Sequence, residues 1–193
     1  MHRLAFSFVL GYHGCDRGVG EALLAGKPFR ESQNDYDWLG PGIYFWEANP
    51  KRAMAFAKET RDRKGSRIRE PFVVGAVLDL RNCLDLTTLA GVEQVRIAYE
   101  SLREGAQVAG RALPENSGDQ LRRNLDCAVI KRLHSILANA GKPAIDTVRG
   151  VFVEGAAAYP GSGIREKTHI QIAVRNGECV KGVFRVPERD FRG

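Results

Sequence analysis

Residues 38–46, with the sequence Trp-Leu-Gly-Pro-Gly-Ile-Tyr-Phe-Trp, constrain the fold more than any other part of the chain. Two glycines bracket a proline, and an unbroken apolar and aromatic run follows them. This pattern predicts a turn that leads directly into a buried β-strand. Glycine lets the backbone approach a neighbour closely, and tyrosine joins a flat apolar ring to a polar tip. The segment therefore suits either an ordinary core strand or the wall of a pocket for a flat ring.

The remaining secondary structure follows from hydrophobic periodicity and from turn residues. Strands are expected over 3–12, 71–80, 146–154, 168–174 and 179–186, and helices over 18–26, 50–63, 89–110 and 119–140. Residues 82–88 are expected to form a turn.

Several helix ends and one hairpin have local signals of their own. Asn49 and Pro50 are a good N-cap and first helical residue. The helix over 119–140 is expected to begin at a cap formed by Ser117 or Asp119 and to end at Gly141. The pair Asn176-Gly177 predicts a tight hairpin between the last two strands.

The order of these elements indicates the fold class. Both ends of the chain are rich in strands, and a helical insertion lies around 86–142. We expect one α+β domain over 1–193 with a mainly antiparallel sheet. No G-x-G-x-x-G follows a strand, and the P-loop motif is missing, which argues against a doubly wound nucleotide-binding fold.

The charge balance favours an anionic partner. The net charge is +6 and the isoelectric point is about 9.3, which suits nucleic acid, an acidic protein or a phosphate-rich cofactor. Residues 61–70 (RDRKGSRIRE) form a basic loop that is either a footprint for a polyanion or a solvated surface.

The four cysteines are widely scattered and form no C-x-x-C pair. This spacing argues against a zinc site, so no metal is expected, and it favours reduced thiols. The apolar run at 4–10 is too short for a signal peptide, and no stretch reaches the ~20 residues that span a bilayer. We therefore expect a cytoplasmic protein without a membrane partner.

Three separated segments form a recognisable arrangement. The first strand leads into His13-Gly14, which can present a ring and a bare backbone amide to a ligand, although a structural histidine is the alternative. The segment Gly-Pro-Gly-Ile-Tyr-Phe at 40–45 follows, and a late strand carries His-Ile-Gln-Ile-Ala-Val at 169–174. Together they resemble the ADP-ribosyltransferases of the poly(ADP-ribose) polymerase and diphtheria-toxin-like clade, which is known for its H-Y-E arrangement.

The resemblance implies a split antiparallel β-sheet core and NAD⁺ as co-substrate. By motif, His13 would bond the adenosine-side ribose, and the Gly14 backbone would hold the nicotinamide carboxamide. Tyr44 would lie against the nicotinamide ring, with Phe56 as the second aromatic or, alternatively, as a core residue. The catalytic set would be His13, Tyr44 and Gln171.

The same resemblance gives roles to two loops. The loop over 27–37 would cover the donor NAD⁺. The glycine- and alanine-rich loop over 155–167 would face the acceptor and expose Tyr159.

Gln171 departs from the family pattern, which has a glutamate at this point of the late strand. An amide can bond a ribose hydroxyl, but it cannot act as a base or carry negative charge. The substitution therefore disfavours polymer elongation and favours a single transfer. Glu154 and Glu166 are candidate substitute acids, and Asp16 and Glu47 are weaker ones.

The expected activity is mono-ADP-ribosylation of a macromolecule. Nucleic acid, with RNA favoured, is the leading acceptor, and protein is the next. The small basic domain resembles bacterial toxins of toxin–antitoxin or phage-defence systems, which implies an antitoxin protein as a further partner. Three alternatives stay open: an NAD⁺ glycohydrolase, a non-catalytic binder of NAD⁺ or nucleic acid, and an RNA 2′-phosphotransferase. The last needs a set of active-site arginines, which the sequence does not locate.

Overall fold

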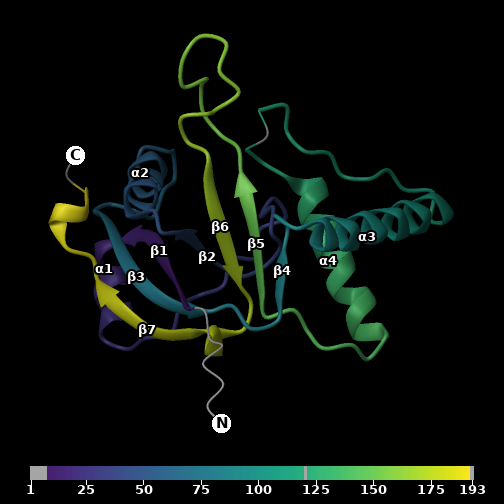
Figure 1. The fold of residues 1–193 in the computed structure, drawn as a ribbon, viewed down its shortest axis with the longest axis horizontal. Helices are drawn as coiled ribbons and strands as arrows, with labels where there is room; N and C mark the ends of the chain where they lie inside the picture. The colour runs from purple at the N-terminus through teal and green to yellow at the C-terminus, as the bar shows by residue number, and fades with distance from the viewer. Residues whose placement is uncertain (1–7, 120, 192–193) are drawn as a thin grey trace.

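The computed structural model describes residues 8–119 and 121–191 (Figure 1). Its strands are β1 (Phe8–Asp16), β2 (Ile43–Glu47), β3 (Pro71–Asp79), β4 (Cys83–Asp85), β5 (Thr147–Phe152), β6 (His169–Val174) and β7 (Val180–Arg185). Its helices are α1 (Arg17–Leu24), α2 (Pro50–Arg61), α3 (Leu89–Val108) and α4 (Asn124–Asn139), with short 3₁₀ helices η1 (Gly177–Cys179) and η2 (Glu188–Phe191).

The strands form one sheet in the order β4-β5-β6-β2-β1-β3-β7. Strands β4 and β5 are parallel, and the other neighbouring pairs are antiparallel. Helices α3 and α4 lie between β4 and β5 in the chain and stand beside that edge of the sheet (Figure 1). The predicted mixture of mainly antiparallel sheet with a helical insertion is confirmed at this level.

The sheet is only weakly joined at its centre. Strands β1 and β2 pair at Gly11↔Glu47 and Tyr12↔Trp46, whereas β1 pairs with β3 along its whole length, from Phe8↔Asp79 to Asp16↔Pro71. Beyond Tyr12, β1 therefore follows β3 and leaves β2. Backbone pairing between β1 and β2 therefore stops before His13, and a gap in pairing opens there.

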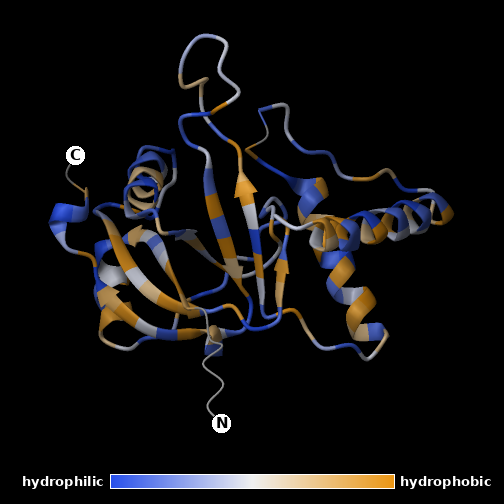
Figure 2. Ribbon diagram, in the orientation of Figure 1, coloured by the Kyte–Doolittle hydropathy of each residue, from blue (hydrophilic) through white to orange (hydrophobic). Residues whose placement is uncertain are grey.

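The segment 38–46 is the buried turn and strand that its pattern predicts. Leu39 is fully buried in the core beneath α3 and α4, and Phe45 is fully buried in a second core between the strands. Hydrophilic and hydrophobic residues alternate along the first four residues of β6, and its last residues are apolar (Figure 2). Ile172 and Val174 face the second core, and Ala173 faces the first, as the alternation predicts.

One predicted helix start is correct and another is wrong. The Asn49 side chain accepts from the Arg52 backbone N–H at 2.9 Å, so α2 begins as expected. Helix α4 begins only at Asn124, because Ser117 and Asp119 bond N–H groups of 121–122 in a turn ahead of the helix. The predicted start at 119 was therefore wrong.

The predicted hairpin at Asn176-Gly177 is also wrong. Strand β6 already has β2 and β5 on its two sides, so β7 has no free edge there and pairs with β3 instead. The Asn176 side chain accepts from the Glu178 N–H and begins η1. The expected turn at 82–88 contains the short strand β4, which has too few residues for a periodic signal.

Strand β1 also differs from its prediction, because it continues past Tyr12 to Asp16. The first five residues of the predicted 3–12 strand lie outside the described part of the chain. All four cysteines are free thiols, and three of them are buried. No helix of the described residues has both the length and the apolar character to cross a bilayer.

Candidate active site

One cavity of about 640 Å³ gathers most of the residues that the sequence singled out. Its lining includes His13, Gly14, Tyr44, Phe56, Glu154 and Gln171. Cofactor and substrate pockets commonly have volumes of roughly 300–1,000 Å³. The loop over 27–37 contributes five further lining residues, so it does border this cavity.

Tyr159 and Glu166 do not line the cavity. Both are solvent-exposed in the loop between β5 and β6, which projects away from the sheet (Figure 1). This position leaves Tyr159 accessible to a macromolecule, but it separates Glu166 from the predicted pocket.

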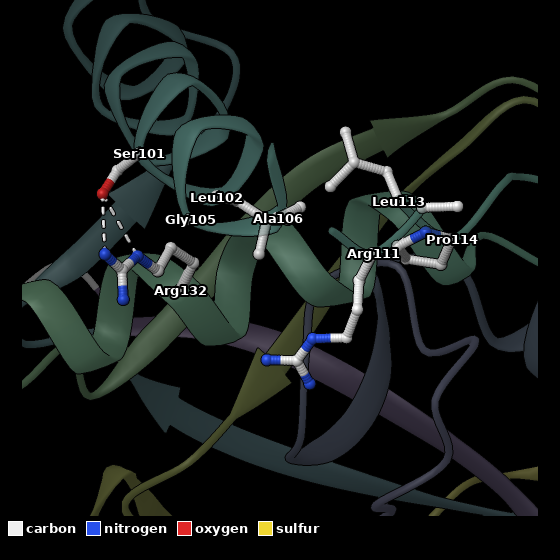
Figure 3. A pocket seen from close by; sticks show the side chains of 9 residues that line it. Ser101, Leu102, Gly105, Ala106, Arg111, Leu113, Pro114 and Arg132 are labelled. Carbon is white, nitrogen blue, oxygen red and sulfur yellow. Dashed lines mark hydrogen bonds between the residues drawn. The ribbon is translucent and has the colours of Figure 1, made fainter. Parts of the chain in front are cut away.

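A second hollow, of about 380 Å³, lies between α3 and α4 (Figure 3). There the Arg132 guanidinium donates to the Ser101 hydroxyl at 2.8 Å. None of the residues singled out from the sequence lines this hollow, so the larger cavity is the candidate active site.

His13 bridges the gap between β1 and β2. Its Nδ1 lies 2.9 Å from the Tyr44 carbonyl oxygen, which can only accept, so Nδ1 carries the proton. Burial lowers the pKa of His13, opposed by the bond to the Tyr44 carbonyl, and the ring is neutral at pH 7. Its Nε2 is therefore a hydrogen-bond acceptor. Phe29 packs edge-on against the same ring at 5.4 Å and holds it in place.

Gly14 is required by the close approach of α2. A Cβ at this position would lie 2.4 Å from the Ala53 carbonyl oxygen. Packing against α2 therefore explains why position 14 is a glycine. Gly14 also lines the cavity.

Tyr44 supports the turn that precedes its own strand. Its hydroxyl accepts from the Leu39 N–H at 3.0 Å and donates to the Gly40 carbonyl at 2.9 Å. Desolvation raises the pKa of Tyr44 well above its usual value, so the hydroxyl keeps its proton. Phe56 lies against Trp46, with ring centroids 4.7 Å apart. Tyr44 and Phe56 thus line one cavity from β2 and α2.

The orientation of Gln171 is set by Trp38. The Trp38 indole Nε1–H donates to Gln171 Oε1 at 2.6 Å. An indole N–H cannot accept, so the atom that it meets is the amide oxygen, and the amide NH₂ is directed elsewhere. Gly150, the cross-strand neighbour of Gln171, makes room for Trp38, because a Cβ there would lie 2.7 Å from the indole ring.

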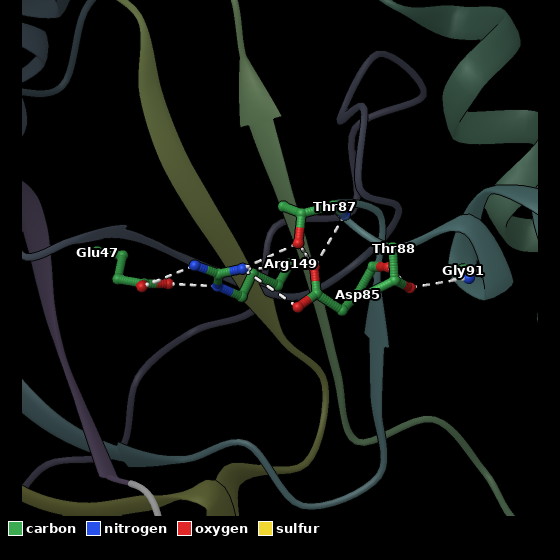
Figure 4. Close-up of polar contacts among 6 residues, drawn as sticks. All are labelled: Glu47, Asp85, Thr87, Thr88, Gly91 and Arg149. Carbon is green, nitrogen blue, oxygen red and sulfur yellow. Dashed lines mark hydrogen bonds and ion pairs between the residues drawn. The ribbon is translucent and has the colours of Figure 1, made fainter.

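Two of the candidate substitute acids, Glu47 and Glu154, form ion pairs with arginines, and Asp16 caps a helix. Glu47 receives two bonds from Arg149, at 2.6 and 2.9 Å, and Asp85 binds the same guanidinium (Figure 4). The bonds to Glu47 raise the pKa of Arg149, so this link between β2, β4 and β5 stays charged. Asp16 caps α1 through the Gly18 N–H. Glu154 lines the cavity, but it is paired with Arg52 at 2.8 Å.

The segment 38–46 was interpreted as a possible pocket wall without naming Trp38 or Trp46 as site residues, and Arg52 was missed as a cavity residue. Arg52, Phe56 and Thr60 all line the cavity and follow one another at intervals of four along α2. That spacing places side chains on one helix face, so Phe56 could have indicated the other two.

Arginines also surround the cavity. Arg30, Arg63 and Arg122 line it from three separate loops and are exposed. Within residues 8–119 and 121–191, none of the three forms an ion pair. Arg122 instead lies over the Tyr36 ring at 5.3 Å.

Comparison with known proteins gives one short match. No family model matches the chain, and no solved structure matches it. A segment of 36 residues is 50% identical to an uncharacterized protein of Methanocaldococcus jannaschii, covering 19% of this chain and 17% of that protein. The matched segment is therefore a small part of both chains.

Proposed function

We propose that the protein is a mono-ADP-ribosyltransferase that transfers ADP-ribose from NAD⁺ to nucleic acid. The observation that carries this proposal is the convergence of His13, Tyr44 and Gln171. These residues lie on β1, β2 and β6, far apart in the chain, and line one cavity. Their shared cavity supports the arrangement that the resemblance implies, with an amide in place of the family's glutamate.

The hydrogen-bonding capacities of the cavity fit a ribose. The neutral His13 ring has an acceptor at Nε2, and the Gln171 amide has donors at its NH₂. A hydroxyl of the adenosine-side ribose can donate to the first, and a hydroxyl of the nicotinamide-side ribose can accept from the second. Tyr44 and Phe56 provide aromatic surface for a flat ring.

The reaction replaces the bond between nicotinamide and ribose C1′ with a bond between C1′ and an acceptor atom. Nicotinamide leaves with the electrons of the broken bond, and the acceptor loses a proton. Positive charge develops on the ribose in the transition state, and a neutral Gln171 can orient the sugar without neutralising that charge. An acceptor that is already nucleophilic is therefore favoured, and a single transfer is expected.

The acceptor is assigned to nucleic acid on electrostatic grounds. Arg30, Arg63 and Arg122 line the cavity without a close ion pair among the described residues, and Arg63 and Arg122 act on Glu59 and Asp119 only through longer-range charge interactions. Such arginines suit phosphate groups. The resemblance extends the proposal to a bacterial toxin that an antitoxin protein would restrain.

The decisive test incubates the protein with NAD⁺ labelled in the adenylate phosphate, together with RNA, DNA and protein fractions. We expect the label on nucleic acid, with RNA the main acceptor, and its loss in a folded Gln171→Ala variant. Label found only in free ADP-ribose would establish a glycohydrolase instead. If no mixture consumes NAD⁺, the enzyme proposal fails and a binding role remains. Label on protein alone would identify a protein-directed transferase.

A second candidate is an RNA 2′-phosphotransferase, favoured by the four arginines Arg30, Arg52, Arg63 and Arg122 that line the cavity. Incubation with RNA carrying a 2′-phosphate distinguishes the two activities. NAD⁺-dependent loss of that phosphate supports the phosphotransferase, whereas label retained on RNA without such a phosphate supports the transferase.

A further inference from the structure

The loop between α2 and β3, residues 62–70, contains most of the basic segment that the sequence singled out. Arg63 stands near its beginning and lines the cavity. Lys64, Arg67 and Arg69 follow and are exposed to solvent. This cationic loop therefore begins at the cavity and continues over the surface of the protein.

Both halves of the cationic loop are held by hydrogen bonds. In the first half, the Ser66 N–H donates to the Arg63 carbonyl at 3.1 Å. In the second half, the Asp16 carboxylate accepts from the backbone N–H groups of Arg69 and Glu70, at 2.9 and 3.0 Å. Asp16 is the last residue of β1, the strand that also positions the first wall of the cavity. The loop is therefore fixed relative to the cavity.

The tip of the cationic loop is open. Gly65 has a φ of +78°, in the left-handed region that favours glycine, and a Cβ there would have no other atom within 4 Å. Lys64 precedes this glycine, and Arg67 follows it two residues later. A large partner can therefore reach both cations.

The carboxylates within or beside the loop are engaged with other groups. They are Asp16, bound to backbone N–H groups, Glu59, bound to Lys167, Asp62, bound to Arg61, and Glu70, bound to Arg17. Arg63 and Arg69 act on two of these carboxylates only through longer-range charge interactions. Lys64 and Arg67 form no ion pair with any residue that the structure describes. The loop thus has an excess of positive charge that an anionic partner can neutralise.

The composition of the loop favours phosphate groups as that partner. Arginine and lysine bind phosphate oxygens, and arginine can do so through two hydrogen bonds. Residues 61–70 include no aromatic side chain, and their one apolar side chain, Ile68, is half-buried. A protein interface normally has an apolar core, and sequence readout needs contacts to base edges, so the loop suits neither.

The position of the loop also favours a particular form of nucleic acid. The acceptor atom must enter the cavity, whereas bases in a duplex are stacked and paired. A single strand can place one nucleotide in the cavity while its neighbouring phosphates lie along the cationic loop.

We propose that the cationic loop binds the phosphate backbone of a single-stranded nucleic acid, independently of its base sequence, and holds it beside the cavity. This surface rests on the proposed function, since the strand that it holds is the acceptor.

Binding of fluorescently labelled oligouridylate and oligoadenylate, each of about 12 nucleotides, tests the surface without NAD⁺. Anisotropy is measured on the whole protein over a range of salt concentrations. In a variant that combines Lys64→Gln and Arg67→Gln, we expect the slope of log affinity against log salt to become shallower by about 1.4, because each phosphate contact to a single strand contributes about 0.7. Affinity at about 0.15 M salt should fall about tenfold, by the same factor for both oligonucleotides.

The matched control combines Arg111→Gln and Lys142→Gln. These two cations are also exposed, but they follow α3 and α4, at the opposite end of the sheet from α2 (Figure 1). The control removes the same net charge and should leave the salt slope unchanged. Equal losses in the two double variants would overturn the proposal, because they would mean that only net charge matters.

Chemical acetylation of the unaltered protein gives a second measurement that does not depend on the folding of a variant. Oligouridylate should protect Lys64 from acetylation and leave Lys142 reactive. Unprotected Lys64 under saturating oligouridylate would overturn the proposal. A duplex of equal length that binds more tightly than either single strand would also overturn it, as would displacement of oligouridylate by oligoglutamate at an equal concentration of charge, which would indicate an acidic protein as the partner.

The outcomes separate this surface from the proposed function. Binding that depends on Lys64 and Arg67, without any label transfer from NAD⁺, refutes only the proposed function. Label transfer to nucleic acid that the loop variant binds as tightly as the wild type refutes only the surface.

Discussion

Replacing Tyr44 by phenylalanine separates the structural role of its hydroxyl from the role of its ring. The hydroxyl bonds the Leu39 N–H at 3.0 Å and the Gly40 carbonyl at 2.9 Å, and Leu39 is fully buried. Tyr44→Phe leaves both backbone groups without this partner, while the ring keeps its place in the core.

The expected loss of stability follows from these two bonds. Each lost hydrogen bond costs about 1 kcal/mol, and a buried partner left unpaired raises this to about 1–3 kcal/mol. We therefore expect the free energy of unfolding to fall by about 2–4 kcal/mol. With a urea m-value of about 2 kcal/mol/M, the midpoint of unfolding should fall by about 1–2 M.

Urea unfolding followed by tryptophan fluorescence is a suitable assay, because Trp38 lies in the turn that the hydroxyl holds. Tyr159→Phe is the matched control: its side chain is 59% exposed, and its substitution should change stability by less than about 0.5 kcal/mol. A Tyr44→Phe protein that unfolds within 0.5 kcal/mol of the wild type would refute the argument that this hydroxyl holds the turn.

Three further changes test the orientation of Gln171 and two partly buried groups outside the cavity, His134 and Arg149. Trp38→Phe keeps an aromatic ring but removes the N–H that orients the Gln171 amide. We expect the kcat of label transfer to fall about tenfold or more. An unchanged kcat would show that the orientation of Gln171 is unimportant. The pKa of His134 is lowered to about 4 by burial, so the unfolded chain takes up a proton that the folded protein does not, and stability should fall as pH drops from about 6.5 to about 4. Denaturation measured over that range should show the free energy of unfolding falling by up to about 3 kcal/mol, and by less in His134→Asn. Parallel curves of unfolding free energy against pH for the two proteins would contradict this. Arg149→Met leaves Glu47 unpaired and should cost about 2–4 kcal/mol in urea unfolding, part of which Glu47→Gln in the same chain should restore; a single variant as stable as the wild type would count against the network.

Local signals were sufficient where a feature depends on neighbours in the chain. The cap at Asn49, the buried strand after the Gly-Pro-Gly turn and the end of α4 before Gly141 all rest on contacts within a few residues. Such contacts are visible in the sequence because propensity and periodicity act over the same range.

The two errors have different causes. Asn176-Gly177 has the pattern of a hairpin, yet β2 and β5 occupy both sides of β6, so the last strand pairs with β3 and tertiary pairing outweighs the local turn preference. Asp119 has the pattern of a cap, yet it accepts from the Leu121 N–H two residues further on and closes a turn ahead of α4. This second error is local, because the same side chain that caps a helix can also close a turn.

The sequence by itself determined the mixture of strands and helices, the buried strand at 43–47, and the residue types from which the resemblance follows. Only the tertiary structure decided the chemical state of those residues. Burial keeps His13 neutral, and the Tyr44 carbonyl fixes the proton on Nδ1 so that Nε2 is the acceptor. The Trp38 indole turns the Gln171 amide, and Arg52 pairs with Glu154. The physical reason is that hydrogen-bond polarity and burial depend on atoms contributed by segments up to 133 residues apart, which no local pattern records.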